Sequence, residues 1–221
     1  MLEGRVKKLK TVEEALAMIK SGDRVMVSGF GNVGDPKQLV AGLSNLKLKD
    51  LTIISNDLGS PGIGLGALLR ANMVKKLIGN YYNWNPEVAD AFNGGKIDVK
   101  LVPQGSFAEG IRAAGVGIPA FFTPTSVGTE LGRDKEEREF GGRKYVLQEA
   151  IKADVALISA TKADRLGNLV YYKVGRNFNP LMAMAAELVI AEVGEIVSEG
   201  ELDPESIVTP HIFVDVLVQG R

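Results

Sequence analysis

The chain contains no cysteine and only one histidine, His211, among its 221 residues. The lack of thiols excludes disulfides, thiolate metal sites and cysteine nucleophiles. A single imidazole disfavours a Ser-His-Asp triad and a multi-histidine metal site, so we expect no bound metal. The available chemistry is therefore that of carboxylates, amides, backbone N–H groups and bound cofactors.

The sequence also lacks an excess of one charge and a long hydrophobic run. Its 26 basic and 27 acidic residues leave a net charge of −1, which gives no reason to expect a nucleic-acid partner. No apolar run approaches the ~20 residues that cross a bilayer. The basic N-terminal stretch, residues 1–20, has no continuous apolar segment behind it, which disfavours a secretory signal. We expect a cytoplasmic protein without membrane contact.

Short apolar segments alternate with helical patterns along the chain, and this alternation predicts an α/β fold with a mainly parallel sheet. No linker, repeat or low-complexity tract divides the sequence, so we expect a single domain over residues 1–221. A capping box at Thr11 opens the first predicted helix. The other predicted helices are Lys37–Leu43, Asn85–Phe92, Phe107–Ala113 and Asn179–Ala186, and the predicted strands are Arg24–Val27, Leu51–Ser55, Val74–Ile78, Val99–Val102, Val155–Ser159, Asn168–Tyr172, Leu188–Glu192 and Ile212–Val218, with a hairpin at Phe140–Val146.

A glycine-rich loop, within VMVSGFGNVGDP at Val25–Pro36, has the G-x-G-x-x-G spacing of a dinucleotide-binding turn. It follows a predicted strand and precedes a predicted helix, and Asp57 is a candidate for the acidic residue expected ~20 positions later. The helix before the strand and the proline at Pro36 argue against a nicotinamide. The loop then offers backbone amides to an anion at a helix N-terminus, or is simply a tight turn.

A second group, Pro103-Gln104-Gly105-Ser106, directly follows a predicted strand. The Gln104 amide and the neighbouring backbone N–H groups could donate to a developing oxyanion, although a plain turn is the favoured interpretation of these four residues alone.

Two further segments are candidates for a site. Residues 115–129, GVGIPAFFTPTSVGT, form an uncharged stretch that we interpret as an irregular segment, suited either to an apolar ligand or thioester tunnel or to packing against another protein chain. In Gly175–Pro180, Arg176 could bind an anion or lie free on the surface, while Asn179-Pro180 is a good helix start.

Taken together, these motifs resemble the A (α) subunit of the family I CoA-transferases, the 3-oxoacid CoA-transferase group. The signature of that subunit is an apolar triplet, Gly-Gly-Phe, three residues, Gly, any residue and Pro. Here it reads VMV, SGF, GNV, GDP, with Ser28 in place of the first glycine. The resemblance runs in order from about Thr11 to Gly220 through LVPQGSFAEGIRAAGVGIPAFFTPTSVGT, ADRLGNLVY, GRNFNPLMAMAA and GELDPESIVTPHIFVD, and the segments IISND, GIGLGALL and VKKLIGNYYNWNPE are closest to bacterial short-chain enzymes.

The resemblance implies a transferase that moves CoA from a short-chain acyl-CoA to a carboxylate such as acetoacetate, acetate or butyrate. The reaction passes through an enzyme glutamate, which forms an acyl anhydride and then a glutamyl-CoA thioester. That glutamate lies in a Ser-Glu-Asn-Gly context on the B (β) subunit. The nearest string here, Ser198-Glu199-Gly200, lacks the asparagine, and Glu109, Glu130 and Glu187 do not fit either. We therefore expect a chain inactive alone, a B partner, and an α2β2 assembly.

The resemblance also assigns residues. Gln104 and Gly105 would stabilise the oxyanion and position the acyl group. CoA would enter as a substrate rather than as a tightly bound cofactor, and the family implies a seven-stranded sheet flanked by helices. The CoA-binding loop would comprise Ser28, Gly29, Phe30, Gly31, Asn32, Val33 and Gly34, and the substrate wall would comprise Gly115, Gly117, Phe121, Thr123 and Thr125.

Two alternatives remain open on the sequence. One is an NAD-dependent oxidoreductase that uses the G-x-G-x-x-G loop. The other is a CoA-binding or assembly module without catalytic duty. Both would keep a nucleotide-bearing ligand at the same loop.

Overall fold

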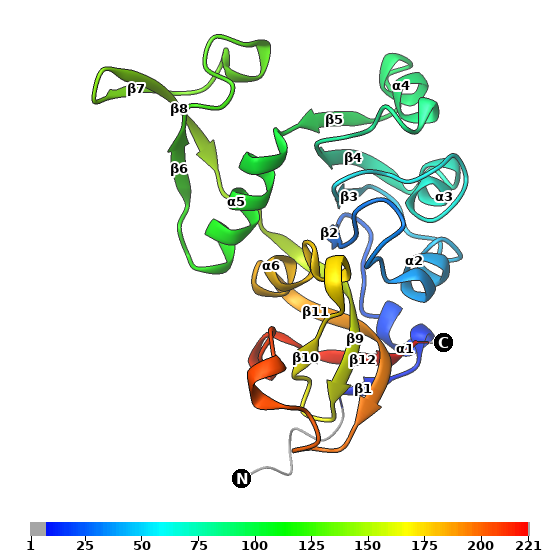
Figure 1. The fold of residues 1–221 in the computed structure, drawn as a ribbon. Helices are drawn as coiled ribbons and strands as arrows, with labels where there is room; N and C mark the ends of the chain where they lie inside the picture. The colour runs from blue at the N-terminus through cyan, green and yellow to red at the C-terminus, as the bar shows by residue number, and fades with distance from the viewer. Residues whose placement is uncertain (1–7, 221) are drawn as a thin grey trace.

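A computed structural model describes residues 8–220 and contains one large, mainly parallel sheet. Eight strands pair in parallel in the order β1-β12-β11-β9-β2-β3-β4-β5, and β10 adds antiparallel to β9 (Figure 1). The predicted α/β class is confirmed, with nine strands rather than seven. The strands are β1 (Leu9–Lys10), β2 (Arg24–Val27), β3 (Leu51–Ile54), β4 (Val74–Gly79), β5 (Asp98–Leu101), β9 (Ala153–Asp164), β10 (Leu169–Val170), β11 (Ala186–Val197) and β12 (Val216–Gln219).

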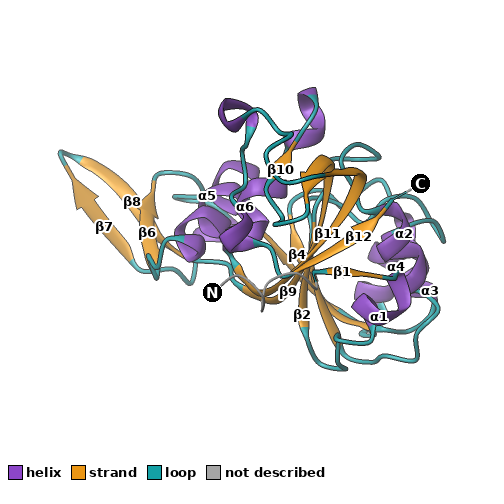
Figure 2. Cartoon of the chain, turned by 90° about the horizontal axis from the view of Figure 1, so that it is seen from below, coloured by secondary structure: helices purple, strands orange, loops and turns teal. Residues whose placement is uncertain are grey.

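Helices cover both faces of this sheet. One face carries α1 (Val12–Leu16), α2 (Lys37–Leu43), α3 (Leu65–Arg70) and α4 (Pro86–Asn93), and the opposite face carries α5 (Gln104–Gly115) and α6 (Asn179–Met184) (Figure 2). The predicted capping box is confirmed, because the Glu14 N–H donates to Thr11 Oγ1 and the Thr11 N–H donates to the Glu14 carboxylate. Within residues 8–220, no helix has both the length and the apolarity to cross a membrane.

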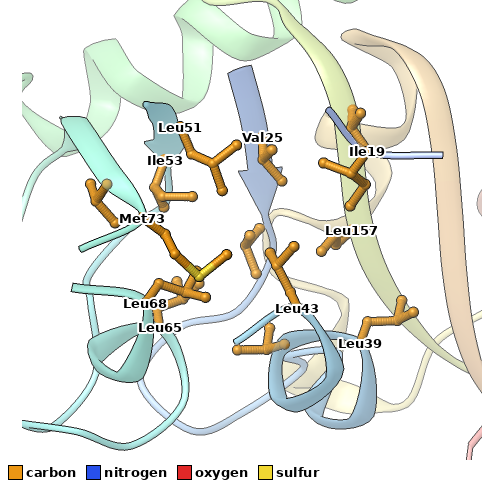
Figure 3. Packing of buried hydrophobic residues seen from close by; sticks show 14 of the residues in the cluster. Ile19, Val25, Leu39, Leu43, Leu51, Ile53, Leu65, Leu68, Met73 and Leu157 are labelled. Atoms are coloured by element: carbon orange, nitrogen blue, oxygen red, sulfur yellow. The ribbon is translucent and has the colours of Figure 1, made fainter. Parts of the chain in front are cut away.

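The inner strands β2 and β3 are apolar at successive positions because both of their faces are buried, whereas the edge strand β5 is mostly exposed. Along β2, Val25 and Val27 pack toward α1 and α2, whereas Met26 between them packs toward α5 and α6. Figure 3 shows the first of these two clusters, in which Leu39 and Leu43 of α2 meet strand residues such as Val25. Two hydrophobic clusters therefore hold the helical layers onto one sheet.

A separate three-stranded antiparallel sheet extends from the main body beyond α5 (Figures 1 and 2). It contains β6 (Ala120–Thr123), β7 (Glu137–Phe140) and β8 (Arg143–Glu149). The predicted hairpin lies here, and Gly141 and Gly142 form its turn with positive φ angles. The prediction that residues 115–129 are wholly irregular is wrong, because β6 pairs with β8. A four-residue strand bounded by prolines on both sides has too short a pattern to be recognised alone.

The order of the main sheet reverses beside β2. The chain moves outward from β2 through β3, β4 and β5, and later fills the other side of β2 with β9, β11 and β12. In open parallel sheets the crevice for ligands lies outside the carboxyl ends of strands at such a reversal. The glycine loop, which directly follows β2, occupies that position.

Candidate functional site

Three of the predicted functional segments meet at the carboxyl edge of the main sheet. The glycine loop follows β2, Asn56 and Asp57 follow β3, and Gln104 follows β5. Because these strands are parallel, their carboxyl ends share one edge. The sheet thus brings together residues that are up to 76 positions apart in the sequence, from Ser28 to Gln104.

A path of hydrogen bonds joins Gln104 to the glycine loop. Gln104 Nε2 donates to Asn56 Oδ1 at 2.8 Å, and Asn56 Nδ2 donates to Asp57 Oδ2 at 2.9 Å. The same Asp57 oxygen accepts the Gly31 N–H at 2.9 Å. Asn56 is the buried member of this path, and it was not predicted as a site residue. Its signal is a polar residue directly after a buried strand, at the edge where Gln104 also lies.

Gln104 and Gly105 form the first turn of α5, which begins three residues before the predicted start at Phe107. The plain-turn interpretation of Pro103–Ser106 is therefore wrong. Pro103 is the N-cap, as suits a residue whose missing N–H would have no helical partner. Both Gln104 and Gly105 are exposed, and a Cβ added at Gly105 would meet no atom within 4 Å. The amide thus lies at an open helix start.

The glycine loop is a closed turn rather than an open cradle of amides. Phe30 and Val33 exchange N–H···O bonds of 3.1 and 3.3 Å, and the Ser28 N–H donates to Leu157 O in β9. With the Gly31 N–H on Asp57, four of the loop's amides have partners in the chain. The expectation of exposed amides aimed at an anion is therefore wrong for these four positions.

The N-terminus of α2 is likewise occupied by a carboxylate of the chain. Glu192, in β11, accepts the N–H groups of Gln38 and Leu39 at 2.9 and 3.0 Å through Oε2. Burial raises the pKa of Glu192, and these two N–H bonds act in the opposite direction. A ligand anion at this helix start would therefore compete with Glu192 for the N–H groups of Gln38 and Leu39. Glu192 lies 154 residues from Gln38 in the sequence, so only the folded chain brings the two together.

A cavity of about 650 Å³ lies between the glycine loop, α2 and the segment Asp57–Ala67. Four of the seven predicted CoA-binding residues line it: Ser28, Gly29, Gly31 and Asn32. Its charged lining consists of Asp35, Lys37 and Asp57. The cavity therefore offers small side chains and backbone to a ligand, with more carboxylates than amines.

The remaining loop residues face elsewhere. Phe30 and Val33 are about half exposed, and Gly34 lies against the segment that precedes α6, beside Gly175 and Asn177. Asp57, the candidate ribose ligand of a nicotinamide site, is bound to the N–H groups of Gly31 and Gly59. Its carboxylate is thus used to hold the loop.

The five residues of the predicted substrate wall do not line this cavity. Gly115 ends α5, and a Cβ added there would stand 2.6 Å from the Cβ of Met184 in α6. Gly117, with φ +77°, turns the chain after the helix. Phe121 and Thr123 belong to β6 of the small sheet, and Thr125 follows that strand. In this chain, helix packing and a separate sheet account for these residues.

The glutamates that we compared with a nucleophile are exposed or paired. Ser198, Glu199 and Gly200 form an exposed turn, and the Ser198 N–H donates to the Glu201 carboxylate. Glu109 pairs with Arg112, whose hydrogen bonds hold the pKa of Glu109 below its usual value. Glu130 pairs with Arg133. Over the described residues, no group of three or more His, Cys, Asp or Glu side chains could hold a metal ion.

The sequence matches known proteins over nearly its whole length. A family model described as coenzyme A transferase matches residues 9–220. The A subunit of the probable succinyl-CoA:3-ketoacid coenzyme A transferase of Bacillus subtilis (strain 168) is 47% identical over 97% of this chain and 90% of its own length. The A subunit of the 3-oxoadipate CoA-transferase of Acinetobacter baylyi is also 47% identical, over 96% of this chain and 94% of its own.

Among solved structures, an acyl-CoA transferase from Escherichia coli O157:H7, in a thioester complex with CoA, superposes with a TM-score of 0.86 at 23% identity. The match covers 99% of this chain and 48% of that one, so the chain spans about half the length of the E. coli protein. This likeness shows the shared fold, while the sequence relatives show which of the two subunits this chain is. The chain therefore belongs to the coenzyme A transferase family, as the A subunit of one of that family's two-subunit transferases.

Proposed function

We propose that this chain, joined to a B subunit, moves CoA between a short-chain acyl-CoA and an acceptor carboxylate. The observation that carries the proposal is the path Gln104–Asn56–Asp57–Gly31, which links an exposed amide to the loop beside the large cavity. Together these groups would hold an acyl carbonyl at Gln104 and the CoA portion along the loop. Residues 28–34 would contact CoA as a substrate that enters and leaves.

Gln104 would contribute to the rate by donating to a developing oxyanion. A primary amide carries two N–H bonds, and one of those on Nε2 is directed to Asn56. This bond fixes the orientation of the amide, so that its second N–H can donate to a substrate oxygen without reorientation of the side chain. Gly105, beside it, would leave room for the acyl group because no atom lies within 4 Å of a Cβ position there.

The nucleophile would come from the B subunit. Its glutamate, in a Ser-Glu-Asn-Gly context, would attack the acyl-CoA carbonyl, releasing the CoA thiolate and leaving an acyl anhydride. The thiolate would then attack the glutamyl carbonyl to give the glutamyl-CoA thioester and the free donor carboxylate. The acceptor carboxylate would reverse these steps and take CoA. We propose an α2β2 assembly, a single domain in each copy of this chain and a cytoplasmic location.

The names of the relatives favour a 3-oxo acid as the acceptor. One relative is named for a 3-ketoacid and another for 3-oxoadipate, and both compounds carry a carbonyl at the third carbon of a carboxylate. Acetoacetate shares this feature, whereas acetate and butyrate lack it. We therefore propose acetoacetate as the preferred acceptor among these three.

The test is to assay the purified chain alone, its B partner alone, and the complex of both. We expect CoA transfer from succinyl-CoA to acetoacetate only in the complex, and slower transfer to acetate and butyrate. A complex whose B subunit has its Ser-Glu-Asn-Gly glutamate replaced by alanine is the control, because it should assemble without turnover. Transfer by the lone chain, or saturable NADH binding with no transfer by the complex, would contradict the proposal.

A further inference from the structure

The glycine loop has a second side, which faces the segment before α6 rather than the cavity. Two asparagines, Asn177 in that segment and Asn179 at the first residue of α6, hydrogen-bond to consecutive carbonyls of the loop. Asn177 Nδ2 donates to Val33 O at 2.9 Å, and Asn179 Nδ2 donates to Gly34 O at 3.1 Å. These bonds join parts of the chain that are 144 and 145 residues apart.

Asn179 is held in a single orientation. Its side chain is fully buried, and Oδ1 accepts the Ser159 N–H of β9 at 2.7 Å. Since only the oxygen can accept from that N–H, Nδ2 must face the carbonyls of Gly34 and Gly175. The central strand of the sheet therefore determines which atoms of Asn179 meet the loop.

The approach between the two segments is also very close. Gly34 has φ +71°, and a Cβ added there would overlap Asn177 Nδ2 and stand 2.5 Å from Gly175 O. The Ser28 hydroxyl donates to the same Gly34 carbonyl at 3.2 Å, from inside the loop. The third glycine of the loop thus serves contact with Asn177 and Asn179, in addition to turning the chain.

We propose that Asn177 and Asn179 are positioning residues for CoA transfer. They hold the glycine loop on the side away from the cavity, so that the side lining the cavity keeps the shape that receives the CoA ester. This inference rests on the proposed function. Neither asparagine lines the 650 Å³ cavity, whereas Ser28, Gly29 and Gly31 do. The asparagines therefore act on the substrate through the loop.

The first test measures the loop itself, by hydrogen–deuterium exchange over residues 28–35 in the A–B complex and in the lone chain. Asn177→Ala removes the bond to Val33 O from a half-buried position that can tolerate truncation. We expect exchange in this segment to rise about fivefold, the effect of losing one net hydrogen bond on local opening. Asn168→Ala is the matched control, because Asn168 is also half-buried and bonds to Asp164 in a different turn. Unchanged exchange over 28–35 in Asn177→Ala would overturn the inference.

The second test separates positioning from general damage in the reconstituted complex. Asn177→Ala should raise KM for the acyl-CoA about fivefold, while kcat and KM for the carboxylate acceptor stay within about twofold. Asn179→Asp should have a larger effect, because its second oxygen would face two carbonyl oxygens, and Asn179→Ser should recover part of the loss. Raised exchange together with an unchanged KM for acyl-CoA would also overturn the inference.

A double-mutant cycle tests the contact directly. Gly34→Ala should raise exchange over residues 28–35, because its new methyl group would overlap the Asn177 amide. The double variant Gly34→Ala, Asn177→Ala lacks that amide, so its total increase in exchange should be smaller than the sum of the two single increases. Fully additive effects would show that the two residues act independently and would contradict the inference. A wild-type complex without transferase activity would instead refute the proposed function, and the exchange results would still decide whether the asparagines hold the loop.

Discussion

The carboxyl edge of the main sheet and the small β6-β8-β7 sheet differ in how they are held together. At the edge, residues far apart in sequence meet through amide and backbone hydrogen bonds that include buried Asn56 and Asn179. The small sheet instead carries exposed ion pairs between residues close in sequence, such as Glu136–Arg138 and Glu137–Lys144. Its aromatic contacts, Phe122–Phe140 and Phe140–Tyr145, are also local to the three strands.

This difference shows where function and stability are sensitive to substitution. A buried hydrogen-bonded amide leaves an unsatisfied partner when it is removed, whereas an exposed ion pair is replaced by water at little cost. Both regions were expected to contribute to one site, but only the edge lies at the strand-order reversal beside β2. The following substitutions test this contrast.

Gln104→Ala should have the largest effect, a loss of ~10²–10³ in kcat of the A–B complex, as is typical when one oxyanion donor is removed. Thermal stability should change little, because Gln104 is exposed at the start of α5. Steady-state kinetics with acyl-CoA and acetoacetate measure the loss. Gln38→Ala is a matched control, since its side chain belongs to α2 and not to the path. Unchanged turnover with normal assembly would favour a non-catalytic module.

Gly115→Ala should destabilise the fold by about 1–3 kcal/mol, the usual cost of overpacking. The new methyl group would stand 2.6 Å from Met184 Cβ and would push α5 and α6 apart. Thermal unfolding measures this cost, and Gly105→Ala, which meets open space, should show no comparable loss. If Gly115→Ala kept its melting temperature and only slowed turnover, Gly115 would belong to the substrate wall after all.

Glu192→Gln should flatten the dependence of stability on pH. The pKa of Glu192 is raised in the folded chain. The protonated side chain therefore adds to the free energy of unfolding at pH values below the unfolded-state pKa, and this added stability is lost as the pH rises through the folded-state pKa. Glutamine can still accept from Gln38 and Leu39 but does not titrate. Denaturant unfolding across mildly acidic pH should show a smaller decline for the variant than for the wild type. Parallel curves would mean that the carboxyl titrates alike in both states.

Lys144→Ala should have the smallest effect, with no measurable change in melting temperature or in kcat. Its ion pair with Glu137 is 2.6 Å long, but both side chains are largely exposed and screened by solvent. Assaying the complex and unfolding the lone chain would check both expectations. A clear loss of assembly with the B subunit would show that the small sheet takes part in the interface.

Local patterns in the sequence predicted many elements well. The strand Arg24–Val27 and the helix Lys37–Leu43 have the bounds that were predicted. The capping pattern at Thr11 and the helix start at Asn85-Pro86 also formed as predicted, because the groups that stabilise them lie within a few residues. The short strands β1 and β6 and the helix α3 were not predicted, since their patterns are brief or rich in glycine.

The candidate site was predicted in part. Gln104 and the glycine loop were recognised because each follows a predicted strand, and the sheet does bring them to one edge. Asn56, Glu192 and Asn177 were not recognised as partners of that edge. Asn56 and Gln104 lie 48 residues apart, and Glu192 and Gln38 lie 154 apart, so no local pattern relates them.

The sequence by itself determined the α/β class, the family and the residues able to donate or accept at the site, because periodicity, motif order and side-chain chemistry are properties of the chain as written. The tertiary structure decided which of those groups hydrogen-bond to one another within the chain. The folded sheet places Asp57 and Glu192 on N–H groups that a free loop and helix start would offer to an anion. A backbone N–H given to the chain's own carboxylate is no longer available to a ligand, and only the folded sheet shows which groups are used in this way.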